Sequence, residues 1–148
     1  MIPECDTDGN LPPGIHRATW EEVDKAFGTN SVRMQLLSGL YRAAKELQKA
    51  GCSTLYIDGS LVTTKDHPGD FDGCWEPAGV DAEKLDPVLL DFRAKRLAQK
   101  VKYGGELFVS SARAEAEPPH RTFLEFFQTD KITGQPKGII ALDLRRLS

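Results

Sequence analysis

The chain has 148 residues, of which 40% are hydrophobic and 28% are charged, and its formal net charge at pH 7 is −3. This composition is that of an ordinary globular domain and excludes a fibrous, low-complexity or disordered chain. The length predicts one domain, 1–148, and the small negative charge argues against a general attraction to nucleic acids or anionic membranes.

The cysteines and the hydrophobic runs bear on the compartment. Cys5, Cys52 and Cys74 are widely spaced and form no CxxC pair, which argues against a disulfide framework and against a zinc site. No basic leader with an apolar core opens the sequence, and no run approaches the roughly 18 apolar residues of a membrane span. We therefore expect a cytoplasmic protein without a membrane segment.

The N-terminal region is predicted to contain an arm and a short helix. Residues 1–13 combine Asp-Gly, Gly-Asn and Pro-Pro pairs, which favour turns. Thr19 and Glu22 form a capping box, in which each side chain accepts the backbone N–H of the other residue. The box predicts a helix that ends near Phe27.

A longer helix is predicted to start after the cap residue Asn30 and to stop at Gly51. Apolar residues recur within it at intervals of three and four, which indicates one buried face. The residues of this face are Leu36, Leu37, Leu40, Tyr41, Ala44 and Leu47. A strand over Ser53–Asp58 follows, with Leu55 and Ile57 on the same side.

The next segments are predicted to be a strand, a helix and another strand. The first strand is Asp70–Trp75, and Asp86-Pro87 provides the cap and first residue of a helix that ends near Tyr103. The side chains it is expected to bury are Leu89, Leu90, Leu97 and Val101. Gly104-Gly105 ends this helix, and Glu106–Ser110 is the third strand.

The C-terminal region is predicted to contain a loop, a short helix and a last strand. Residues 112–120 are polar and contain proline, as expected of a loop. Thr122 and Glu125 form a second capping box, which opens a short helix. A turn at 133–136 leads into a strand over Gly138–Leu144. Together these elements predict an α/β or α+β fold, with a small mixed β-sheet flanked by helices.

Two aspartates provide the strongest chemical signal. Asp70 and Asp72 are separated by one residue, so in a strand they project from the same face. Ionised carboxylates this close repel each other unless water, a proton or a cation lies between them. Magnesium prefers oxygen ligands, and two such ions roughly 4 Å apart promote in-line phosphoryl transfer.

Gly59 and Ser60 offer the complementary groups. Glycine lets the backbone come close to a phosphate, and the backbone N–H and the Ser60 hydroxyl are hydrogen-bond donors. The spacing alone leaves two interpretations open. One is a metal and phosphate site, and the other is a surface loop followed by an edge strand.

The stretch Gly-Ser, nine residues, Asp-Phe-Asp resembles the signature of the DNA polymerase β-like nucleotidyltransferase superfamily, and of its minimal nucleotidyltransferases in particular. A narrower resemblance, to a bacterial family of uncharacterised proteins similar to minimal nucleotidyltransferases, covers most of the chain. It rests on the segments L-P-P-G-I-H-R-A-T-W-E-E-V, A-G-C-S-T-L-Y-I-D-G-S, P-G-D-F-D-G-C-W and F-F-Q-T-D-K-I-T-G-Q-P-K-G-I-I. The resemblance implies a nucleotidyltransferase-like fold in which Gly59 and Ser60 hold the triphosphate and Asp70 and Asp72 bind Mg2+.

The resemblance also implies a third carboxylate on a later strand, as a metal ligand that helps to activate the attacking hydroxyl. Glu106 lies on the strand after the crossover helix, which is the expected order. Asp143, in A-L-D-L, better matches the expected local pattern but comes one strand later. Glu106 is the preferred candidate, and Asp143 is the alternative.

The sequence also departs from the family pattern. Many minimal members continue Gly-Ser with an arginine and a further glycine, whereas this loop reads L-V-T-T-K-D-H-P-G. Gly73 follows the second aspartate, where an apolar residue is usual. Lys65 is a candidate replacement for the missing basic contact to phosphate.

The function implied is a magnesium-dependent nucleotidyltransferase that moves a nucleoside monophosphate from an NTP to a hydroxyl. A protein or an RNA is the expected acceptor, within a toxin–antitoxin pair. The alternative is a catalytically weak or inactive protein that keeps the fold and binds a partner protein, as an antitoxin does.

Overall fold

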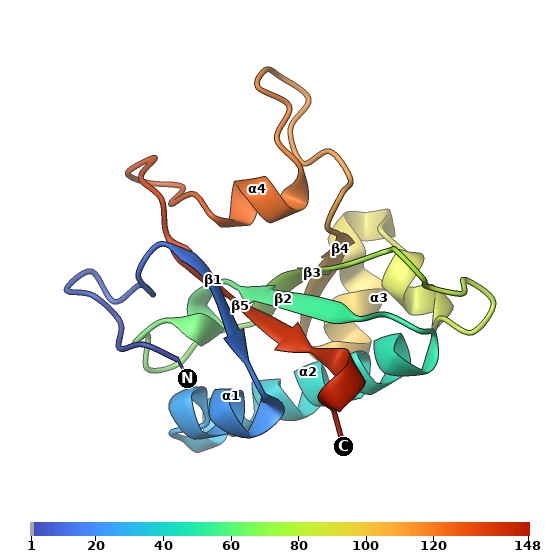
Figure 1. Ribbon diagram of the computed structural model, residues 1–148, viewed down its shortest axis with the longest axis horizontal. Coiled ribbons are helices and arrows are strands. Elements are labelled where there is room, and N and C mark those ends of the chain that lie inside the picture. Colours follow the sequence, from blue (N-terminus) through green and yellow to red (C-terminus); the bar gives the residue numbers. More distant parts are fainter. Residues whose placement is uncertain (1) are drawn as a thin grey trace.

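A mixed β-sheet forms the centre of the protein in the computed structural model, which describes residues 2–148 (Figure 1). Within these residues the sheet has five strands: β1 (Gly14–Ala18), β2 (Thr54–Asp58), β3 (Phe71–Trp75), β4 (Gly105–Val109) and β5 (Gly138–Asp143). Their order across the sheet is β1-β5-β2-β3-β4. The pairs β1–β5 and β3–β4 are parallel, and β2 is antiparallel to both of its neighbours. The expected α+β class with a small mixed sheet is thus confirmed.

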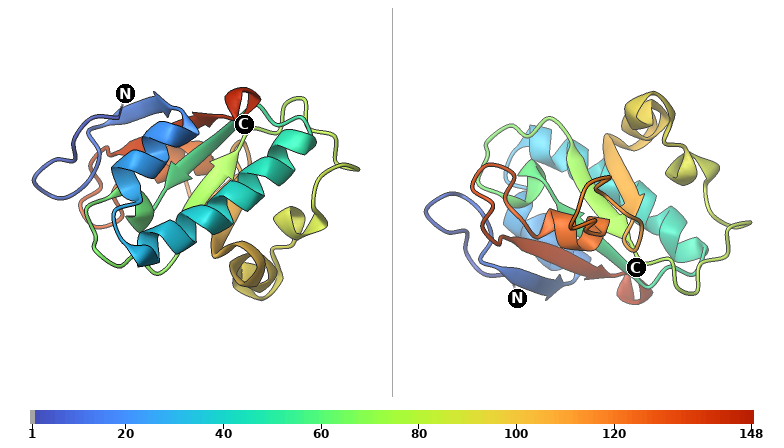
Figure 2. Two further views of the ribbon diagram at one scale, coloured as in Figure 1. Left: turned by 90° about the horizontal axis from the view of Figure 1, so that it is seen from below. Right: turned by 90° about the horizontal axis from the view of Figure 1, so that it is seen from above.

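Helices cover both faces of this sheet. They are α1 (Trp20–Phe27), α2 (Ser31–Lys49), α3 (Arg93–Tyr103) and α4 (Phe123–Phe127). The helices α1 and α2 lie across one face, whereas α4 lies on the opposite face (Figure 2). The helix α3 packs against β4 and α2 at one edge. Three short 3-10 turns, at Ser60–Val62, Pro87–Leu90 and Leu144–Arg146, complete the elements of the described chain.

The predicted helix caps are present. The Thr19 hydroxyl accepts the Glu22 backbone N–H at 3.2 Å, and the Glu22 carboxylate accepts the Thr19 N–H at 3.0 Å. The Asn30 side chain caps α2 by accepting the Arg33 N–H at 2.9 Å. Gly51, with φ +93°, follows the end of α2 in a conformation that favours glycine.

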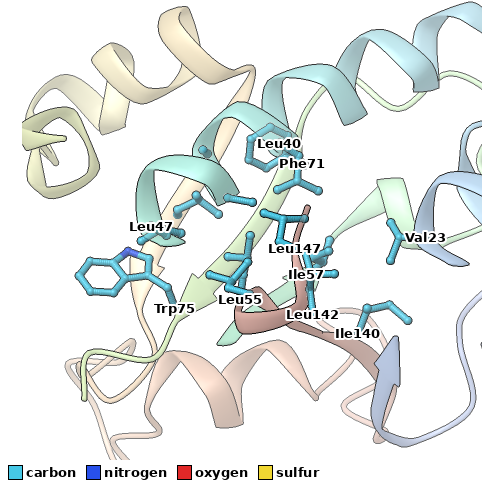
Figure 3. Packing of buried hydrophobic residues seen from close by; sticks show 14 of the residues in the cluster. Val23, Leu40, Leu47, Leu55, Ile57, Phe71, Trp75, Ile140, Leu142 and Leu147 are labelled. Atoms are coloured by element: carbon cyan, nitrogen blue, oxygen red, sulfur yellow. The ribbon is translucent and has the colours of Figure 1, made fainter. Parts of the chain in front are cut away.

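The main core lies between the sheet and the helices α1 and α2. Leu40 and Leu47 of α2 face Leu55 of β2 and Leu142 of β5 (Figure 3), and all four are fully buried. Burial of one such side chain contributes about 1.5–3 kcal/mol. Of the face predicted for α2, Leu36 and Tyr41 are only partly buried.

The strand β1 was not among the predicted elements. Residues 14–18 are mostly exposed, and only Ala18 is buried, so the segment lacks the alternation of buried and exposed residues that identifies a strand. It becomes a strand because its backbone pairs with β5, more than 100 residues later in the chain.

The continuous helix predicted from Asp86 to Tyr103 is wrong. Asp86 caps only the 3-10 turn Pro87–Leu90, and the α3 backbone is interrupted where Ala94, Lys95 and Arg96 have φ of +50°, +57° and +63°. Because of this interruption, the residues before and after it do not follow one helical repeat, so the apolar residues do not share one face.

The prediction of the residues buried by this segment is also mostly wrong. Leu89 is buried, but Leu90, Leu97 and Val101 are 45%, 55% and 79% exposed. The helix instead buries Gln99, whose Oε1 accepts the Leu107 N–H of the edge strand β4 at 2.8 Å. A buried polar side chain thus supplies the hydrogen bond that a further strand would otherwise provide.

The other predicted helix ends and strands agree with the structure. Gly104, with φ +91°, ends α3 in the left-handed conformation. The Thr122 capping box opens α4, with Oγ1 accepting the Glu125 N–H at 3.2 Å. The strands β3, β4 and β5 lie within one residue of the predicted bounds.

Candidate functional site

Three carboxylates form a row across neighbouring strands. In the sheet Asp58 of β2 pairs with Asp72 of β3, and Asp72 pairs with Glu106 of β4. Directly paired residues project from the same face, with Cβ atoms roughly 5 Å apart. Cys74 and Phe108, two positions further along β3 and β4, pack in the cluster beneath α4. The row therefore lies on the face that α4 covers.

The structure brings most of the predicted carboxylates together. Asp70 lies just before β3, and its charge acts on Asp72. Glu106, the preferred third carboxylate, is the direct neighbour of Asp72. Asp143 pairs with Thr54, four residues before Asp58 and roughly 13 Å away along the strand. Asp143 also forms an ion pair with Arg145 at 3.0 Å, so it does not belong to the row.

Gly59 lies directly against this row. Its φ is +82°, and a Cβ built on it would be 2.8 Å from Oδ2 of Asp72 and 3.3 Å from the Asp72 backbone nitrogen. Backbone conformation and space therefore both require glycine here. Ser60 begins the 3-10 turn that follows, and its hydroxyl has no hydrogen-bond partner within residues 2–148. The predicted Gly-Ser turn and the aspartates thus meet at one end of β2 and β3.

Arg33 of α2, which is 3% exposed, holds the loop after this turn in place. Its guanidinium donates six hydrogen bonds to five backbone carbonyl oxygens, among them those of Leu61 at 2.6 Å and Lys65 at 2.6 Å. The burial of the guanidinium lowers its pKa. A buried cation satisfied by carbonyl groups is a rigid support for a loop.

Basic side chains lie at both ends of the carboxylate row. The Lys137 ammonium is 2.9 Å from Oδ1 of Asp58. At the other end, the Lys100 ammonium and the Arg96 guanidinium lie 2.8 Å and 3.4 Å from Oε1 of Glu106. Each outer carboxylate is therefore paired with at least one cation.

Asp72, in the middle of the row, has neither a hydrogen bond nor an ion pair through its carboxylate within the described residues. Burial, followed by the charges of the neighbouring carboxylates, raises the pKa of Asp72 to about 7. Burial also raises the pKa of Asp58, although the charge of Lys137 acts in the opposite direction. The centre of the row is thus the position at which an added cation would relieve the most repulsion.

The donor set has the chemistry of a magnesium site, because every candidate ligand is a carboxylate oxygen. In the arrangement described for residues 2–148, no three His, Cys, Asp or Glu side chains form a metal-binding group. Lys100, Arg96 and Lys137 hold the outer carboxylates instead. Metal binding would therefore require Glu106 to exchange basic partners for the metal.

Lys65, the proposed replacement for the missing arginine, is exposed, and its backbone carbonyl accepts hydrogen bonds from Arg33. Its ammonium contacts neither Asp70 nor Asp72 in the described chain. The structure therefore does not bring this predicted phosphate ligand to the carboxylates.

Two residues of the site, Asp58 and Arg33, were missed by the sequence analysis. Asp58 could be found by strand alternation, since it directly precedes Gly59 and lies on the side opposite Ile57. Lys137 belongs to a turn whose position over β2 depends on the tertiary fold. Arg33 resembles any surface arginine of a helix, and no local signal distinguishes it.

A protein-family model described as "Family of unknown function (DUF6932)" matches residues 3–143. The chain belongs to this family. No curated protein matches it, and no solved structure matches it. The helices described within residues 2–148 include none that is long and apolar enough to cross a membrane. Because this family has no known function, it assigns no activity to the site described above.

Proposed function

We propose that the protein is a magnesium-dependent nucleotidyltransferase that transfers a nucleoside monophosphate from an NTP to a hydroxyl group. The observation that carries this proposal is the contact between the Gly59-Ser60 turn and Asp72, at the centre of a carboxylate row. Backbone N–H groups and a free hydroxyl suit phosphate oxygens, and unpaired carboxylates suit the cations that accompany them. The resemblance to minimal nucleotidyltransferases, noted in the sequence, points to the same chemistry.

The roles follow from position. Gly59 and Ser60 would bind the phosphate chain, and Asp70, Asp72 and Glu106 would hold magnesium. When bound, magnesium neutralises the phosphate charge that develops during transfer. The acceptor oxygen bonds to the α-phosphorus, the bond from that phosphorus to the oxygen bridging to the β-phosphate breaks, and pyrophosphate leaves. Glu106 is the proposed acceptor of the hydroxyl proton.

The acceptor is proposed to be a hydroxyl of a protein or of an RNA, supplied by a partner within a toxin–antitoxin pair. The five strands and four helices of the described chain offer no separate substructure for a large acceptor. A partner would therefore complete the acceptor side of the site.

A second candidate function is a binding protein that has kept this architecture with little or no catalysis. Two observations favour it: basic side chains already hold Glu106 and Asp58, and the loop after Ser60 lacks the arginine of related enzymes. In this case partner binding would not depend on Asp70 or Asp72.

Thermal unfolding in the presence of magnesium and each NTP tests the proposal. The proteins compared are the wild type, the double variant Asp70→Asn/Asp72→Asn, and Glu117→Gln as an exposed control. A ligand that binds only the folded state stabilises it by about 2.7 kcal/mol at a hundredfold excess over Kd. We expect stabilisation that requires both magnesium and an NTP, that is lost in the double variant, and that is kept in the control. No stabilisation of the wild type by any NTP would overturn the enzyme proposal in favour of the binding protein.

A further inference from the structure

The hairpin between α4 and β5, residues 128–138, lies beside the carboxylate row and carries two lysines. Its base is held by the bridge between Thr129 and Pro136 and by the hydrogen bond from Lys137 N–H to the Gln128 carbonyl, at 2.9 Å. The Asn10 amide donates to the Asp130 carboxylate at 3.2 Å and ties the hairpin to the N-terminal arm, next to which it lies in Figure 1. Lys137 therefore extends from a well-supported position.

Lys137 is held against Asp58 with most of its side chain buried. The side chains of Lys137 and Asp58 are 18% and 6% exposed, and their charged atoms are 2.9 Å apart. An ammonium has three hydrogen-bond donors, and Asp58 is the only acceptor for this one within the described chain. Two donors of a largely desolvated cation thus remain available to another acceptor.

The Lys137 ammonium lies near the Gly59-Ser60 turn. Asp58 directly precedes Gly59, so Lys137 lies at the end of the row where the phosphate chain would bind. Lys100 and Arg96 lie at the opposite end, beside Glu106. Arg33 also reaches this turn, but backbone carbonyl groups take up its donors, which leaves Lys137 as a basic side chain with free donors at this end of the row.

The negative charge around the Gly-Ser turn indicates what Lys137 can do at this end of the row. The site carries four carboxylates, Asp58, Asp70, Asp72 and Glu106, and a nucleoside triphosphate is itself strongly anionic. Like charges a few Å apart repel each other strongly in a partly screened site. A fixed cation at this end therefore favours the approach of a phosphate chain, in addition to any metal.

We infer that Lys137 binds the phosphate chain of the nucleotide held by Gly59 and Ser60, and that Asp58 is the residue that positions it. This inference rests on the proposed function and specifies how the site recognises a triphosphate. Lys137 supplies the basic contact that the loop after Ser60 lacks, from a hairpin distant in the sequence. The ligand class is a nucleoside triphosphate, in preference to a monophosphate.

Titration calorimetry tests the role of Lys137. It measures the binding of magnesium-NTP and of the corresponding NMP to the wild type, to Lys137→Met and to Lys137→Arg. Lys84→Met, with the same loss of charge at an exposed position outside the hairpin, is the control. We expect Lys137→Met to raise Kd for the NTP at least tenfold and Kd for the NMP less than threefold. Lys137→Arg should recover most of the NTP affinity, and Lys84→Met should change either Kd less than threefold.

Lys137→Met leaves Asp58 buried without its partner, so a second pair of variants guards against misfolding. Neither Asp58→Asn nor Asp58→Asn/Lys137→Met leaves an unpaired carboxylate at position 58, and only the first keeps the Lys137 ammonium. The first should bind NTP at least tenfold more tightly than the second, with equal NMP affinity.

Equal losses for NTP and NMP, or no loss, would overturn the role of Lys137 while leaving the nucleotide site in place. A wild type that binds no NTP would overturn the proposed function, and this inference with it. The two failures are distinguished by the wild-type titration alone.

Discussion

Asp72 is the residue whose charge is least compensated in the site. It lies between Asp58 and Glu106 in the sheet, and both of these have basic partners that Asp72 lacks. The pKa of its carboxyl is raised to about 7, compared with an ordinary value of about 3.9 in the unfolded chain. The folded state therefore holds a proton that the unfolded state releases between these two values.

The sign of the pH effect follows from this difference. As pH rises from about 4 to about 7, ionisation of Asp72 costs more in the folded state than in the unfolded state, so stability falls and stays reduced above pH 7. Asp72→Asn removes the charge and keeps the shape. In metal-free buffer it should raise the free energy of unfolding by about 1–2 kcal/mol at pH 8, a value discounted for partial solvent exposure, and much less at pH 4.

Urea unfolding at both pH values, with EDTA present, measures this prediction. The exposed Glu117→Gln should stay within about 0.5 kcal/mol of the wild type at each pH. A destabilised Asp72→Asn at pH 8 would contradict the idea that repulsion dominates at this position. A gain in stability on removing a carboxylate is expected where a charge is kept for function rather than for folding.

At the scale of elements, the loop after the Gly-Ser turn depends on α2 for its shape. The loop has no strand partner, and its carbonyl groups are satisfied instead by Arg33 from the first turn of the helix. The same helix buries Leu40 and Leu47 in the core. The position of Ser60 is thus coupled to the packing of α2.

Arg33→Met should therefore destabilise the protein and loosen the loop. Methionine fills part of the volume but leaves buried carbonyl groups without donors, at an expected cost of about 2–4 kcal/mol in the free energy of unfolding. Arg42→Met, at an exposed position of the same helix, should cost less than about 1 kcal/mol, since it loses only the contact of the guanidinium with the Tyr103 ring at 5.7 Å. Denaturant unfolding gives both values, and hydrogen exchange of residues 61–65 should accelerate in Arg33→Met alone.

An Arg33→Met variant as stable as Arg42→Met would mean that water replaces the guanidinium without penalty. The loop would then be held by its own turn geometry. This outcome would contradict the coupling between α2 and the site.

At the scale of the whole molecule, α2 and α3 approach each other so closely that a side chain is excluded between them. A Cβ built on Gly39 would be 1.8 Å from the carbonyl oxygen of Tyr103. Tyr103 is itself buried at the end of α3. The contact fixes how the edge of the sheet that carries Glu106 sits relative to α2.

Gly39→Ala should destabilise the protein by about 1–3 kcal/mol, because the backbones of α2 and α3 must separate to admit the methyl group. This cost should exceed the gain of about 1 kcal/mol that alanine brings over glycine within a helix. Gly69→Ala is the matched control. No atom lies within 4 Å of the position of its Cβ, so its effect should range from neutral to stabilising by about 0.5–1 kcal/mol. Thermal or urea unfolding decides, and a Gly39→Ala variant at least as stable as the wild type would show that the helices can separate freely.

The sequence by itself determined the elements whose signals are local. The capping boxes at Thr19 and Thr122, the stop at Gly51 and the alternation in β2 depend on hydrogen bonds and burial within a few residues, so their patterns are readable along the chain. The Asp70–Asp72 spacing and the Gly59-Ser60 turn were recognisable for the same reason. These features were sufficient for the α+β class and for the centre of the candidate site.

The tertiary structure alone decided the rest. The strand β1 exists because it pairs with β5, and the interruption in α3 places Gln99 rather than Leu97 inside. Strand order places Glu106, and not Asp143, beside Asp72. Lys137 and Arg33 reach the site from distant parts of the chain. Each of these depends on contacts between segments far apart in sequence, and no local pattern encodes a partner that only the folded sheet brings near.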